Sequence, residues 1–84
     1  GLDTWIMRQS WSSDQRAVEA WLERDAQAVG KPASVLVTLA AGTACRATWS
    51  GQPVTAREVV PGCWAVTLPA GALRGALHVS VNEA

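Results

Sequence analysis

The sequence predicts an α+β fold, in which one N-terminal amphipathic helix packs on a small antiparallel sheet of about four to five strands. Apolar residues recur at helical spacing within residues 12–30, and after Pro32 the spacing changes to the alternation that is typical of strands. The segments between the later strands are short, whereas parallel strands would need long crossover connections. An 84-residue chain has room for one domain, so we expect residues 1–84 to form a single unit.

The helix is predicted for residues 12–30, after an N-terminal segment of residues 1–11 whose spacing fits a strand and a helix equally well. Ser12 stands three residues before Gln15, which is a capping-box arrangement. Gly30 stands where a left-handed C-terminal cap is needed, and a proline follows that prevents continuation. The apolar stripe between these ends consists of Val18, Trp21, Leu22 and Val29.

An antiparallel β region is predicted for residues 35–81, because β-branched and apolar residues alternate there between turns that contain glycine or proline. The expected strands are residues 35–39, 44–50, 54–60, 63–68 and 76–81. In a meander, the helix would cover one face of a single sheet. In the alternative, the strands form two facing sheets, similar to an immunoglobulin-like sandwich that carries an N-terminal helix.

The two cysteines, Cys45 and Cys63, both fall within predicted strands. An even number of cysteines in a small chain favours a disulfide bond, which would add about 3 kcal/mol of stability. In a meander their strands would lie about 9.5 Å apart, beyond the roughly 7 Å between Cα atoms that a disulfide tolerates. The bond therefore requires the sandwich, whereas the meander predicts two free thiols.

The charge balance excludes one class of partner. Seven basic residues balance seven acidic ones, and the sequence pI is about 6.8. Without a basic field, we expect no nucleic acid to be held by charge. The apolar runs are too short to span a membrane. The chain begins with Gly1, which is compatible with a piece of a longer protein whose membrane anchor precedes Leu2.

The reactive side chains do not predict an enzyme. His78 is the single histidine and is expected on a surface or edge, while Glu19 and Glu23 lie one helical turn apart on a solvated face. Two cysteines cannot supply the four ligands of a structural zinc site, and no glycine-rich phosphate loop is present. We therefore expect no catalytic residues, no metal and no cofactor.

Tryptophan is unusually frequent, with five residues and no Phe or Tyr. Three tryptophans are expected in the core: Trp21, Trp49 and Trp64. Trp5 and Trp11 precede the predicted helix and are expected to be the most exposed, so with Arg8 they are the candidate partner-binding residues. In the alternative, they fasten the N-terminal segment to the sheet.

The run from Val35 to Leu39 is apolar and carries no charge. As an unprotected edge strand it would pair with another chain. We therefore expect it to be either a central strand or a site of strand addition by a partner.

These observations predict a non-catalytic, extracytoplasmic (periplasmic or secreted) interaction or assembly module with a protein partner. A helix that runs into a small antiparallel sheet is similar to the head domains of type IV pilins and pseudopilins, which would make the chain the soluble part of a membrane-anchored protein. The first alternative is a carbohydrate-binding or accessory β-module of a secreted hydrolase, whose mark would be tryptophans aligned on one face. The second alternative is a small enzyme that uses Cys45 or Cys63 with His78.

Overall fold

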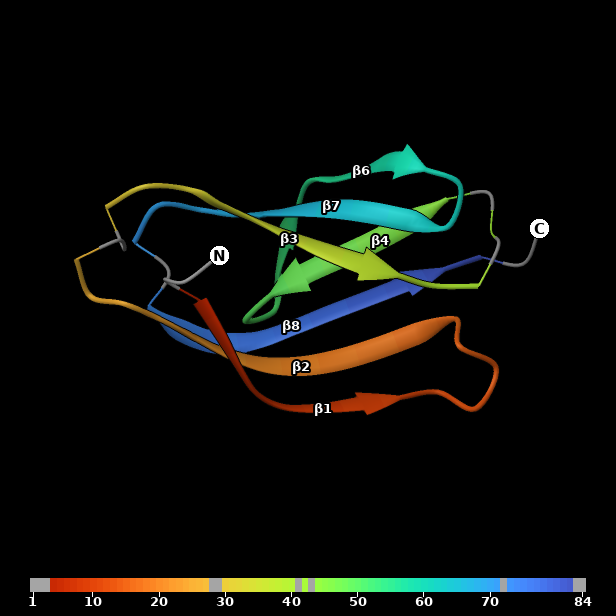
Figure 1. The fold of residues 1–84 in the computed structure, drawn as a ribbon, viewed down its shortest axis with the longest axis horizontal. Helices are drawn as coiled ribbons and strands as arrows, with labels where there is room; N and C mark the ends of the chain where they lie inside the picture. The colour runs from red at the N-terminus through yellow and green to blue at the C-terminus, as the bar shows by residue number, and fades with distance from the viewer. Residues whose placement is uncertain (1–3, 28–29, 41, 43, 72, 83–84) are drawn as a thin grey trace.

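The computed structural model describes residues 4–27, 30–40, 42, 44–71 and 73–82. These residues form eight strands in two antiparallel sheets, and no helix occurs among them (Figure 1). The strands are β1 (Thr4–Trp11), β2 (Ala17–Arg24), β3 (Ala33–Thr38), β4 (Cys45–Trp49), β5 (Gln52–Val54), β6 (Ala56–Val60), β7 (Cys63–Leu68) and β8 (Arg74–Val81). The described part of the chain accordingly holds no helix of the length and apolarity needed to cross a membrane.

The two sheets have different numbers of strands. Sheet A has five strands in the order β1-β2-β8-β4-β5, and sheet B has three in the order β3-β7-β6. The chain changes sheet after β2, β3, β5 and β7, so each sheet is assembled from segments that are distant in sequence. Figure 1 shows β1 and β6 at opposite borders of the molecule, with β3 and β7 crossing over the strands of sheet A.

The core lies between the two sheets, because alternate side chains of each strand point to opposite faces. Val79 of β8 and Val66 of β7 are fully buried, one from each sheet. The largest of the other fully buried side chains are Leu22, Leu68 and Leu77. Trp49 and Trp64 are buried in the same cluster, which confirms their predicted place in the core.

One side of this sandwich is closed by the chain itself. Only Thr55 separates β5 from β6, so a single stretch of chain passes there from sheet A to sheet B. The backbone amide of Thr67 donates a hydrogen bond of 2.9 Å to the carbonyl of Thr55 and fixes this crossing. On the opposite side, between β1 and β3, no described strand crosses, and β1 is exposed along almost its whole length. This open side is where the candidate site lies.

The predicted helix over residues 12–30 is wrong. Residues 17–24 form β2, which pairs with β1 on one side and β8 on the other, while the predicted helix end at Val29 lies outside the described residues. The meander and the immunoglobulin-like sandwich both included this helix, so the all-β arrangement replaces both. The similarity to pilin heads rested on the same helix and has lost its basis.

Pairing with strands on both sides explains why the helical spacing of apolar residues in 12–30 gave the wrong prediction. Inward-facing positions of β2 are occupied by Val18, Ala20 and Leu22, and the outward-facing Trp21 hides this alternation because it is apolar too. Ala, Glu, Leu and Arg favour helices only weakly, by tenths of a kcal/mol, so pairing on both sides of β2 outweighs their preference.

The predicted capping residue does cap, but in a hairpin. The hydroxyl oxygen of Ser12 accepts hydrogen bonds from the backbone amides of Arg16 (3.1 Å) and Ala17 (3.0 Å) in the turn between β1 and β2. Gln15 has a φ of +62°, in the left-handed region, which ends any right-handed helix at this residue.

The strands predicted in the second half are close to the observed ones, and β7 has the predicted bounds of 63–68. The predicted strand at 54–60 is divided at Thr55 between the two sheets. The turn expected at Gly51–Pro53 lies one residue earlier, because Ser50 and Gly51 both have positive φ angles and form a two-residue hairpin.

The predicted disulfide is not formed, although the strands do lie in two sheets. Cys45 and Cys63 are both free thiols and half-buried. Cys45 is opposite the buried Val81 and packs against the core, whereas Cys63 is opposite the exposed Thr38 of β3. The pleat thus points the Cys63 side chain to the outer face of sheet B and away from the core.

Candidate functional site

Four strands form the edges of the two sheets, and three of them carry protective features. β5 is three residues long and contains Pro53, and β6 carries Arg57, Glu58 and a bulge before Val60. β1 carries Arg8 and a bulge next to it. Short length, proline, charge and bulges are the features by which natural sheets prevent pairing with other chains.

The fourth edge, β3, has none of these features. Its residues pair with β7 in an unbroken register from Ala33 to Thr38, and none of them is charged or proline. Leu36, at its centre, is 67% exposed, the highest value among the exposed large hydrophobic side chains. The uncharged run noted in the sequence is therefore an open edge strand, so its main-chain groups remain available for pairing.

An apolar groove lies beside this edge, between β3 and β1. Its walls are Ile6, Gln9 and Trp11 from β1 and Val35, Leu36 and Val37 from β3. Its floor is formed by apolar side chains of β2 and β8. None of the described residues that line it is charged, and we call it the β1–β3 groove.

The structure separates the three predicted partner-binding residues. Trp11 is opposite Val18, so it faces the core side of sheet A and lines the β1–β3 groove. Trp5 and Arg8 are opposite Glu23 and Trp21, which places both on the outer face. Trp5 and Trp11 are 48% and 39% exposed, which confirms that they are exposed, but they do not form one surface.

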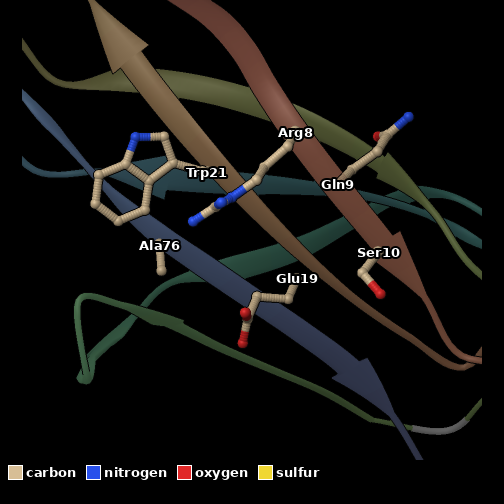
Figure 2. A pocket seen from close by; sticks show the side chains of 6 residues that line it. All are labelled: Arg8, Gln9, Ser10, Glu19, Trp21 and Ala76. Atoms are coloured by element: carbon tan, nitrogen blue, oxygen red, sulfur yellow. The ribbon is translucent and has the colours of Figure 1, made fainter.

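A second hollow lies on the outer face of sheet A. It is lined by Arg8, Ser10, Glu19, Trp21 and Ala76, all on one side of the sheet (Figure 2). The Arg8 guanidinium carbon lies 5.9 Å from the centre of the Trp21 ring, within the range of a cation–π contact. The prediction that Trp21 lies in the core is wrong, since it is half-buried on this outer face.

The residues of the enzyme hypothesis are not brought together. His78 is opposite Glu19 and Thr48 on the outer face of sheet A. Cys45 packs against the core from the other face of that sheet, and Cys63 belongs to sheet B. Among the described residues, no group of three or more His, Cys, Asp or Glu side chains could hold a metal ion.

Burial raises the pKa of the Cys45 thiol, because desolvation disfavours the charged thiolate. Since the thiolate is the nucleophile, we expect iodoacetamide to modify Cys45 more slowly in the folded chain than in the chain unfolded in urea at neutral pH. The rate should rise as the pH approaches the raised pKa, and mass spectrometry of the labelled peptides measures it. Equal rates in the folded and unfolded chains would contradict a buried, unactivated thiol.

Comparison of the chain with protein-family models, curated proteins and solved structures found no match.

The sequence did not single out Ile6 or Leu36 as groove residues, although Leu36 belongs to the run that was predicted as a possible site of strand addition. The sequence indicates that the run containing Leu36 is either an edge strand or a central strand, and it does not distinguish between the two. Ile6 had no signal of its own, because β1 matches a strand and a helix equally well and its inner face is fixed only by pairing with β2. Glu19 had been interpreted as part of a solvated helix face, and it instead lines the hollow on the outer face of sheet A.

Proposed function

We propose that this chain is a non-catalytic protein-interaction module that binds an extended segment of a partner protein along β3. The observation that carries the proposal is the contrast between β3 and the other three edges: β3 alone lacks charge, proline and bulge. Strand addition uses the free main-chain groups of such an edge for affinity and the neighbouring pockets for specificity.

The open side has room for one added strand. On the open side, the edge strand of sheet A is β1. The inward-facing side chain of Ile6 on β1 is 57% exposed, because sheet B ends at β3 and does not cover it. A strand paired with β3 would extend sheet B over β1 and cover Ile6 and Trp11. A second copy that paired through its own β3 would bring its own β1 into the same space, so a lone segment fits better than a symmetric dimer.

The groove also sets the chemistry of the segment. Because the lining residues that the structure describes are all uncharged, an inward-pointing charge on the partner would lose its hydration without gaining a counter-ion from them. Successive side chains of a strand point to opposite faces, so the segment should carry apolar residues at alternate positions.

Selection of short random peptides displayed on phage tests this proposal. The enriched peptides should show apolar residues at alternate positions, and Ile6→Lys should weaken their binding at least about tenfold, which is 1.4 kcal/mol. Val60→Lys on β6 is the matched control, since Val60 and Ile6 are 58% and 57% exposed. Calorimetry measures both affinities.

Three outcomes would overturn the proposal: no enriched peptide, enriched peptides without the alternation, or equal losses in the two lysine variants. Both substitutions are at exposed positions, so urea unfolding should give stabilities within about 0.5 kcal/mol of the parent chain. Dimerisation of the free chain in sedimentation, abolished by Leu36→Lys, would instead assign the edge to a second copy.

A further inference from the structure

The outer face of sheet A carries a second recess that the peptide-binding proposal does not use. The hollow of Arg8, Ser10, Glu19, Trp21 and Ala76 adjoins another that Trp11, Ser12, Glu19 and His78 help to line. Ser10 and Glu19 line both hollows, so the two are neighbours across β1, β2 and β8, and we call them together the outer groove.

The outer groove combines the indole of Trp21 with polar groups. Trp21 lines the hollow beside Arg8, whereas Trp11 lines the other hollow from the end of β1, with its side chain on the core side of sheet A. Ala76 lies beside Trp21 in the hollow, and both side chains are on the same side of the sheet (Figure 2).

The charges in the groove are opposite and remain apart. Arg8 and Glu19 line the same hollow, yet no ion pair joins these two described residues. Figure 2 shows both side chains on the side of the sheet that carries Trp21, while Gln9 points away. An anion would be attracted by Arg8 and repelled by Glu19, and a cation the reverse, so the charge balance favours a neutral ligand that offers both donors and acceptors.

We propose that the outer groove binds a neutral oligosaccharide. The C–H face of a pyranose ring packs on an indole such as that of Trp21, which buries apolar area with little conformational loss. The guanidinium of Arg8 donates hydrogen bonds to the hydroxyl groups of the sugar, and the carboxylate of Glu19 accepts hydrogen bonds from them.

The test is NMR titration of the intact chain with cellotetraose, xylotetraose, chitotetraose and maltotetraose. One of these sugars should shift the indole N–H signal of Trp21 in a saturable way and leave those of the buried Trp49 and Trp64 unchanged. Glu19→Gln should weaken this binding at least about tenfold. Glu23→Gln, four residues along the same strand and outside the groove, is the matched control.

Absence of a saturable shift with all four sugars at millimolar concentration would overturn the proposal, as would equal effects of the two glutamine variants. Tighter binding of an acidic or basic oligosaccharide, such as tetragalacturonate or a chitosan tetramer, would contradict the charge argument. The result is independent of the peptide proposal, because Ile6→Lys changes the other face of sheet A and should leave sugar binding unchanged.

Discussion

Val79→Asp should prevent stable folding at neutral pH. Val79 is fully buried in β8 at the centre of the core, so the new carboxylate would lie among apolar side chains with no partner. An uncompensated buried charge costs about 3–5 kcal/mol or more, which approaches the whole stability of a domain at the lower end of the usual 5–15 kcal/mol. Circular dichroism and urea unfolding at pH 7 measure the loss.

The penalty from Val79→Asp should shrink in acid, because burial raises the pKa of such a carboxyl above its value in the unfolded chain. Below the unfolded pKa of about 3.9 the group is neutral in both states, so the cost of burying the charge disappears there. Ser80→Asp is the matched control one residue along β8, on the outer face and opposite Arg46. A Val79→Asp chain as stable as the Ser80→Asp chain would contradict the position of the core.

Leu68→Ala should lower the free energy of unfolding by about 2–5 kcal/mol, the range for removing a large aliphatic side chain from a core. Leu68 ends β7 and is fully buried between the two sheets. Leu36→Ala is the matched control, because Leu36 lies on the neighbouring strand and is mostly exposed. Its cost should be within about 0.5 kcal/mol. Urea unfolding of both variants decides the matter, and similar losses would contradict the assignment of Leu36 to the surface.

The strands of the second half of the chain could be predicted from the sequence, because the local residue pattern there agrees with the strand pairing that forms. In β8 the apolar residues Leu77, Val79 and Val81 alternate with outward-facing residues, and glycine marks the turns on either side of β7. β2 could not be predicted from the sequence, because the small side chain of Ala20 faces the core and the large side chain of Trp21 faces outward, the reverse of what is expected. Its strand is specified by β1 and β8, and that information is not local to residues 17–24.

The candidate site was predictable in part. The uncharged run at β3 left two alternatives, a central strand or an edge open to a partner. The strand order of sheet B, which places β3 at an edge, decides between them. The exposure of Trp5 and Trp11 was expected, but not their separation, because a bulge between Ile6 and Arg8 changes which residues of β1 share a face. The thiols are free because the pleat of β7 points the Cys63 side chain away from the core. That direction depends on the pairing register of β7, which the number of cysteines does not reveal.

Strand addition at β3 is tested most directly by cross-strand nuclear Overhauser effects between a selected peptide and the isotope-labelled chain. We expect contacts between α-protons of the peptide and those of β3, together with contacts from its inward side chains to Ile6 and Trp11. Contacts to β6 or to the outer face of sheet A, with none to β3, would contradict the account.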